Sequence, residues 1–398
     1  MTERSLKTAL SRWENNRTVP DAFYRRLLTT VLELKDVDDL FVRSGTYVHD
    51  LPGAVDLMEG LSAGQGKPSK DHPDAGLGLI DDDQVIAGYL FTRSFSVLDA
   101  DSLWASSVHT VADRLRARAA ELMDLDFALG GGHVRQALTD LFRDQVVPEL
   151  RSCRGKPRHR EVFSAAAEVI QLLGWTAYDE GQHGLAARYF VLGLRLAEEA
   201  GDHLMGSRLL ANLSHQYTFI GRPQRALTFA RAAQAALRGR GTAAVETMCV
   251  MMEARALAVL GDARAAVATI GHAETLFDRS ASDEPAWISY YDDAELAGDI
   301  AHAFKDLGQH AEVRKFTNLA ITSTTPQRTR SFIHFVAAHA ALMAGEAGEA
   351  ADLAESALRD GAGLQSARQM SYVREFRRRA SGVDAPELRG AVDPILSP

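Results

Sequence analysis

The chain of 398 residues has little cysteine and no long apolar run. Its 2 cysteines, Cys153 and Cys249, form no CxxC pair, so neither a disulfide framework nor a thiolate metal site is expected. No apolar stretch approaches the roughly 18–20 residues that a membrane helix needs. The N-terminus also lacks the apolar segment of a signal peptide. These absences predict a cytoplasmic protein without a membrane partner.

Motifs of catalysis and metal binding are missing as well. The 13 histidines are scattered, and no HExxH or GxSxG motif occurs. The GGGH stretch at 130–133 lacks the Lys-Ser/Thr of a phosphate-binding loop, so we interpret it as a helix-breaking loop. The sequence therefore predicts no enzyme, no metal and no cofactor.

Composition points to a soluble globular protein of two or three domains, with 46% apolar and 24% charged residues. The net charge of −9 argues against nucleic-acid binding by the whole chain but leaves room for a local basic patch.

Such a patch lies in the first segment, residues 1–43. Leu6, Leu10 and Trp13 recur at helical spacing, and Pro20 cannot continue that helix. Asp21 then caps a second predicted helix, AFYRRLLTTVLEL. Between residues 4 and 26 the chain has six basic and two acidic side chains, a balance that suits phosphate contacts. A solvated helix face is the alternative interpretation of the same charges.

The stretch SRWEN at 11–15 resembles the end of the recognition helix in Cro/repressor-type helix-turn-helix proteins, and the resemblance covers Ser5 to Leu34. That family has two helices ahead of this one, so we expect an incomplete DNA-binding head that starts in mid-domain. The resemblance implies DNA contacts by Arg4, Lys7, Thr8, Ser11, Arg12, Asn15 and Arg17.

Residues 44–100 read as a linker of uncertain structure. Gly, Pro, Ser and Asp dominate 62–83, and the run VIAGYLFTRSFSVL at 85–98 is open between strand and helix. Residues 101–160 are predicted as a helical connector, with a helix from Asp101 to Met123 capped by Asp99 or Asp101.

Residues 161–381 repeat a helical-hairpin pattern, and 382–398 form a tail. Five glycines follow at intervals of 40, 40, 47 and 37 residues: Gly181, Gly221, Gly261, Gly308 and Gly345. Small or short residues lie seven before, five after and twelve after each glycine. This register resembles the tetratricopeptide motif, in which small residues let the two helices of a hairpin approach closely. The sequence thus predicts an all-α protein, a partial helix-turn-helix followed by a tetratricopeptide-like α-solenoid.

Taken together, these parts resemble large actinobacterial transcriptional regulators of the Cro/repressor (XRE) type. The resemblance implies that the array senses a ligand, peptide or protein partner and controls a DNA-binding head in a homodimer, formed through the array or a C-terminal helix near 365–379. The alternative is a protein-interaction adaptor that has lost DNA binding and sequesters a partner.

The inner face of such an array would carry an open, hydrated ligand groove, in which Arg208 and Asn212 are exposed and their substitution by Ala leaves the fold nearly unchanged. Rows six and thirteen residues before each glycine hold polar and aromatic side chains, which are unusual among apolar helices. A wet inner face without any ligand is the alternative. The predicted groove residues are Glu168, Trp175, Arg208, Asn212, His215, Arg255, Glu295, His302 and His339.

Overall fold

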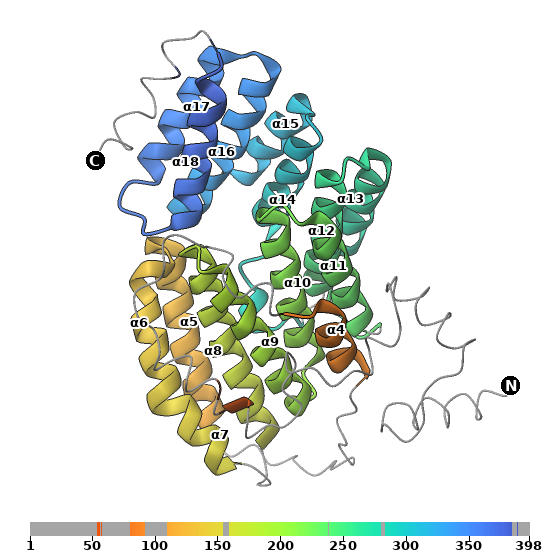
Figure 1. The fold of residues 1–398 in the computed structure, drawn as a ribbon, viewed down its shortest axis with the longest axis vertical. Helices are drawn as coiled ribbons and strands as arrows, with labels where there is room; N and C mark the ends of the chain where they lie inside the picture. The colour runs from red at the N-terminus through yellow and green to blue at the C-terminus, as the bar shows by residue number, and fades with distance from the viewer. Residues whose placement is uncertain are drawn as a thin grey trace, which may run out of the picture.

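The computed structural model describes residues 54, 55, 57, 80–91, 110–153, 159–237, 239–279, 283–383 and 388, and every regular element in these ranges is a helix (Figure 1). The predicted all-α class is therefore confirmed for this part of the chain. The predicted DNA-binding segment at 1–43, with all seven of its proposed contact residues, lies outside the described residues.

Helices follow one another in consecutive pairs, each joined by a tight turn. In each turn lies one of the five spaced glycines, with φ between 70° and 85°, a region that glycine adopts without steric cost. The pairs are α8 (His159–Asp179) with α9 (His183–Ala200), α10 (His203–Phe219) with α11 (Pro223–Leu237), α12 (Ala243–Val259) with α13 (Ala263–Phe277), α14 (Asp293–Asp306) with α15 (His310–Ala320), and α16 (Gln327–Ala344) with α17 (Ala347–Asp360).

The small residues of the register lie where neighbouring helices touch. A Cβ atom at Gly174 would come within 2.4 Å of the Phe190 ring, so α8 and α9 could not pack at their present distance with any larger residue there. In the next pair, the Ser214 hydroxyl donates a hydrogen bond to the Ala226 carbonyl at 2.8 Å across the α10–α11 contact. The repeat spacing thus reflects close packing within each hairpin.

Ahead of the pairs, the connector is itself helical and packs on α8. It comprises α5 (Val111–Leu129), α6 (Gly131–Leu141), a π-helical turn (Phe142–Val146) and α7 (Val147–Cys153). Gly130, with φ of 89°, ends α5, but the rest of the GGGH stretch is not the predicted loop, because Gly131, Gly132 and His133 form the first turn of α6. The predicted start and cap are wrong: α5 begins at Val111, and Thr110 caps it in a capping box with Asp113.

Part of the predicted linker is a helix, α4 (Asp82–Phe91), which packs on α11 and α9. Arg225 forms an ion pair with Asp82 and stacks over the Tyr217 ring at 4.4 Å. Periodicity could not assign this segment because Val85 to Leu90 are buried all round the helix.

The C-terminal part returns to the beginning of the array. After the last pair, α18 (Ala367–Ala380) packs on α16 and reaches α8, while α16 touches α5. The Gln365 N–H donates to the Leu129 carbonyl at 3.2 Å, and the Gln365 carbonyl accepts from Gly132 N–H at 3.2 Å. In Figure 1 the blue helices α16 and α18 accordingly lie above the yellow-orange α5 and α6. The row of hairpins closes on itself.

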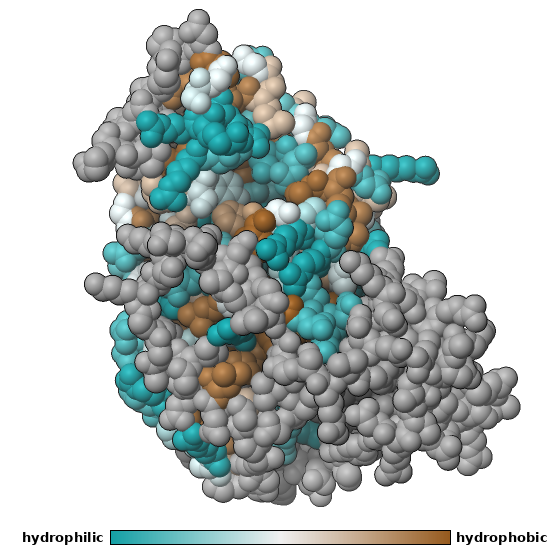
Figure 2. Space-filling view, in the orientation of Figure 1, coloured by the Kyte–Doolittle hydropathy of each residue, from teal (hydrophilic) through white to brown (hydrophobic). Residues whose placement is uncertain are grey.

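On the face shown in Figure 2, the hydrophobic residues of the described chain form separate small areas between hydrophilic ones. The larger exposed apolar side chains are spread over several helices, with Leu125 and Leu129 on α5, Val267 on α13 and Leu319 on α15. Among the described helices, none combines the length and apolar character that crossing a membrane requires.

Candidate functional site

A cavity of about 120 Å³ lies inside the closed array. The first helix of each pair contributes to its wall, and α5, α18 and the segment before α14 complete it. Because the lining comes from both ends and the middle of the array, the cavity exists only when the hairpins are closed into a ring.

Seven of the nine predicted groove residues line this cavity: Trp175, Arg208, Asn212, His215, Arg255, Glu295 and His302. They come from α8, α10, α12 and α14, so the repeat register brings together residues up to 127 positions apart (302 minus 175).

The other two predicted residues lie elsewhere. The Glu168 carboxylate accepts a hydrogen bond from Arg116 Nε at 2.7 Å on the α5 side. The His339 ring packs edge-on against Phe376, and its Nδ1 lies 2.8 Å from the Phe335 carbonyl oxygen. Both side chains hold neighbouring helices together and contribute nothing to the cavity wall.

The open, hydrated groove expected from the sequence is wrong for the described structure. Arg208, Asn212 and Arg255 are only 5%, 7% and 6% exposed. The reason is the return of α16 and α18 to α5 and α8, which covers the inner face that a more extended solenoid would leave open.

Two of the arginines at this closure have strong ion pairs. Arg328 Nη2 lies 2.6 Å from the Asp179 carboxylate and its Nη1 lies 3.5 Å from Asp126, while Arg368 Nε lies 3.4 Å from Asp179. Burial alone would raise the pKa of Asp179, but Arg328 and Arg368 lower it below its ordinary value. For Asp126 burial dominates, aided by the Asp179 charge, and raises the pKa to about 6.

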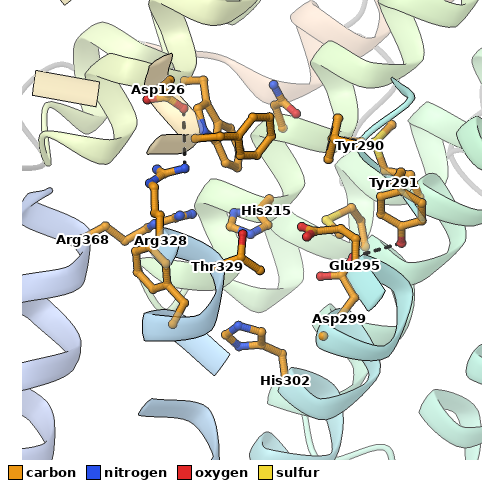
Figure 3. A pocket seen from close by; sticks show the side chains of 18 of the residues that line it. Asp126, His215, Tyr290, Tyr291, Glu295, Asp299, His302, Arg328, Thr329 and Arg368 are labelled. Carbon is orange, nitrogen blue, oxygen red and sulfur yellow. Dashed lines mark hydrogen bonds and ion pairs between the residues drawn. The ribbon is translucent and has the colours of Figure 1, made fainter. Parts of the chain in front are cut away.

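Arg255 is also paired. Its Nη1 donates to Asp299 at 2.9 Å, and the Tyr291 hydroxyl donates to the other Asp299 oxygen at 3.0 Å. Figure 3 shows Glu295, Asp299, Tyr290 and Tyr291 on one side of the cavity and Arg328 and Arg368 on the other, with His215 between them.

Arg208 differs from these three arginines because no carboxylate among the described residues forms an ion pair with it. Its guanidinium stacks over Trp287 at 4.8 Å and Tyr290 at 5.5 Å, and Nη1 donates to the Trp287 carbonyl at 3.0 Å. Burial lowers the pKa of Arg208. The carboxylate of Glu168, which acts on this charge from a distance, is held by Arg116.

Several buried polar atoms of the lining have no hydrogen-bond partner within the described chain, and most of them are donors. A buried unpaired donor costs free energy that an acceptor on a ligand would recover. The donors are Arg208 Nε, Asn212 Nδ2, Arg255 Nε and Arg328 Nε, and the acceptors are Asp126 Oδ1 and Gln171 Oε1, whereas His215 Nδ1 can be either.

The two histidines of the lining are neutral at pH 7. Burial, followed by the charges of nearby basic side chains, of which Arg255 acts on both, holds the pKa values of His215 and His302 well below the ordinary range. His215 packs on the Trp175 and Tyr178 rings with centroids 5.4 and 5.5 Å away. Trp175 lines the cavity and gives it an aromatic wall beside its charged groups, whereas Tyr178 lies outside the lining and is fully buried.

A second, larger chamber of about 590 Å³ adjoins the cavity. Both are lined by Met123, Phe127, Tyr290, Glu295 and Thr329, which therefore form the boundary between them. Burial, with the nearby Asp299 and Asp292 charges, raises the pKa of Glu295 to about 7.

Some lining residues escaped prediction although the register contained a signal. Tyr291 and Arg328 both lie seventeen residues before a turn glycine, one helical turn from the predicted row. Leu172, Asn212, Met252 and Asp299 all lie nine residues before one. Asp126, Arg368 and Tyr372 lie outside the five pairs, so no repeat position could indicate them.

The described residues contain no group of three or more histidine, cysteine or carboxylate side chains arranged to hold a metal ion. Comparison of the chain with protein-family models, with curated proteins and with solved structures finds no match.

Proposed function

We propose that the protein is a transcriptional regulator in which a closed, tetratricopeptide-like array binds a small ligand and controls a DNA-binding head at residues 1–43. The observation that carries the proposal is the cavity, which lies inside the array, has both polar and apolar lining residues, and is built from every hairpin. A ligand in such a place touches all the hairpins at once, so its binding can shift their mutual arrangement.

The regulatory part of the proposal comes from the sequence. The SRWEN stretch and its surrounding basic residues resemble a recognition helix, and a regulator of this type reads two half-sites as a dimer. A small ligand fits the cavity better than an extended peptide or a protein partner, because the inner volume is about 120 Å³. The buried free cysteines Cys153 and Cys249 suit a reducing cytoplasm.

The proposal is tested by filling the cavity. Ala211 on α10 lines it and is 2% exposed, so Ala211→Leu should occupy part of the ligand volume. We expect the full chain to bind DNA fragments at low salt, weakly and with little sequence preference, and Ala211→Leu to change that affinity by roughly 5-fold or more, the range of ordinary allosteric coupling.

Ala232→Leu is the matched control. Ala232 on α11 is 5% exposed and lies outside the cavity lining, so the variant perturbs packing without filling the cavity. Equal effects of the two variants on DNA binding would contradict ligand control, and no DNA binding by the wild type would leave the adaptor function in its place. Light scattering that returns a 43.3 kDa monomer at tens of micromolar would contradict the dimer.

A further inference from the structure

The two chambers differ in charge. Four arginines line the inner cavity, but among the described residues no arginine, lysine or histidine lines the outer chamber. The outer chamber instead has hydroxyl groups and the carboxyl groups of Asp124, Asp292 and Glu295. A ligand that spans the boundary therefore meets positive charge at its inner end and negative charge at its outer end.

At the inner end, helix α10 presents a row of donors. Arg208 and Asn212 are one turn apart on the same helix face, and His215 follows on that face. Arg208 Nε and Asn212 Nδ2 are buried without a partner in the described chain, and the Arg208 charge has no ion pair there. A carboxylate satisfies both donors and the charge, with hydrogen bonds stronger than neutral ones.

At the boundary, Glu295 is the complementary group. Its neighbour Asp299 is occupied by Arg255 and Tyr291, but no described residue donates a hydrogen bond to the Glu295 carboxyl group. The rings of Phe127 and Tyr290, 5.4 Å apart between centroids, lie at the same boundary and offer further attraction to a cation. An ammonium group fits this position.

Size restricts the ligand further. The inner cavity of about 120 Å³ is comparable to engineered cavities of roughly 150 Å³ that bind benzene, so it takes only a small head group. Trp175, Met248 and Phe332 supply apolar surface for a carbon skeleton, and the outer chamber has room for the remainder.

We propose that the cavity binds a small zwitterion of the amino-acid type, with its carboxylate at Arg208 and Asn212 and its ammonium group at Glu295. This inference rests on the proposed function, since it names the ligand class of the same sensory cavity. An anion alone would leave Glu295 unpaired, and a cation alone would leave Arg208 unpaired. Only a molecule with both charges satisfies both.

The test measures melting temperature and Kd of the full chain with the common α-amino acids, 4-aminobutanoate and 6-aminohexanoate. We expect at least one of them to raise the Tm by several degrees at millimolar concentration. The matching acid without the amine and the matching amine without the carboxylate should bind at least tenfold more weakly, because each lacks one charge-assisted contact.

Two variants test which residue binds the carboxylate of the ligand and which binds its ammonium group. Arg208→Gln should weaken binding of the amino acid and of its carboxylate-only analogue about tenfold and leave binding of the amine-only analogue unchanged. Glu295→Gln should weaken binding of the amino acid and of the amine-only analogue and leave binding of the carboxylate-only analogue unchanged. Arg195→Gln and Glu349→Gln, which remove ion-paired charges outside the cavity, serve as matched controls.

The inference is overturned if no compound of the panel raises the Tm, if the carboxylate-only analogue binds as tightly as the amino acid, or if both variants weaken both analogues equally. In any of these cases, if Ala211→Leu still changes the affinity for DNA, the proposed regulatory function stands and the cavity binds a ligand of another class. If Ala211→Leu leaves the affinity for DNA unchanged as well, both the proposed function and the ligand class are contradicted.

Discussion

Arg328 and Arg208 line the same cavity and are 3% and 5% exposed, yet their surroundings differ. Arg328 has two carboxylates, Asp179 and Asp126, from helices at the other end of the array. Arg208 has aromatic rings and a backbone carbonyl. The cost of desolvating a buried charge is offset only by a well-placed counter-charge. The charge of Arg328 has two such carboxylates, and the charge of Arg208 has none among the described residues.

The difference separates a structural part of the cavity from a part available to a ligand. The contacts that close the array converge on Asp179. Its carboxylate forms an ion pair with Arg328 of α16 and accepts hydrogen bonds from Ser366 Oγ at 3.0 Å and from Gly131 N–H at 3.2 Å. These groups lie 149, 187 and 48 residues away in sequence, so one side chain ties the first helices to the last. In the part of the chain that the structure describes, no carboxylate makes such contacts with Arg208.

The largest effect should follow from Asp179→Asn. The substitution keeps the shape of the side chain but leaves Arg328 and Arg368 without their main counter-charge, and breaking a buried pair costs about 3–5 kcal/mol. We expect the Tm to fall by several degrees or more at pH 7. Because the folded-state pKa of Asp179 is lowered, this contribution is present above its ordinary pKa and is lost as the pH falls through the folded value.

The control is Asp144→Asn, which removes an exposed ion pair to Arg143 at 2.7 Å. An exposed pair contributes little, so the Tm should barely change. If the two substitutions lowered the Tm equally, the closure would not depend on the Asp179 contacts.

How far the sequence predicts this structure depends on the range of the interactions. The turn glycines and small residues such as Gly174 and Ser214 act within one hairpin, and their spacing predicted the helical pairs and most inner-face positions. The closure depends on curvature accumulated over five pairs, which no local pattern encodes. An open groove was therefore expected where Arg208 and Asn212 are in fact buried.

The same argument explains which site residues were missed. Arg255 was predicted from its register position, and its partner Asp299 shares a position with Asn212, so a wider choice of register rows would have found it. Asp126 and Arg368 reach the cavity from α5 and α18, outside the repeats. Only the three-dimensional closure brings them to the site.

Glu295→Gln should have a smaller, pH-dependent effect. The folded-state pKa of Glu295 is about 7 against an ordinary 4.5, so the folded chain holds a proton that the unfolded chain releases between these values. Stability is therefore lost as the pH rises from about 4.5 to 7. The variant lacks this loss, and its Tm relative to wild type should increase by a few degrees between pH 5 and pH 8.

Asp126, with a pKa of about 6, acts in the same direction but is present in both proteins, so the difference in Tm isolates Glu295. Glu349→Gln, on the outer surface of the array near Arg314, is the control and should give a difference in Tm that does not grow with pH in this way. A difference for Glu295→Gln that shrinks as the pH rises would contradict a protonated carboxyl at the boundary.

The smallest effect on stability should come from Arg208→Met, and it bears most directly on the comparison. Met keeps the length and much of the volume of the side chain, so no large cavity forms, and it removes a buried charge that has no counter-charge in the described chain. The sequence suggested an exposed Arg208 whose truncation to Ala would be harmless. Because Arg208 is buried, truncation to Ala would leave a void, so the harmless substitution is expected to be Met rather than Ala. We expect melting curves at pH 7 to place the Tm of Arg208→Met at or slightly above that of wild type, where Asp179→Asn lies well below it. A fall as large as that of Asp179→Asn would show that the contacts with Trp287 and Tyr290 stabilise the fold as fully as the closure does, and the distinction between the two arginines would be lost.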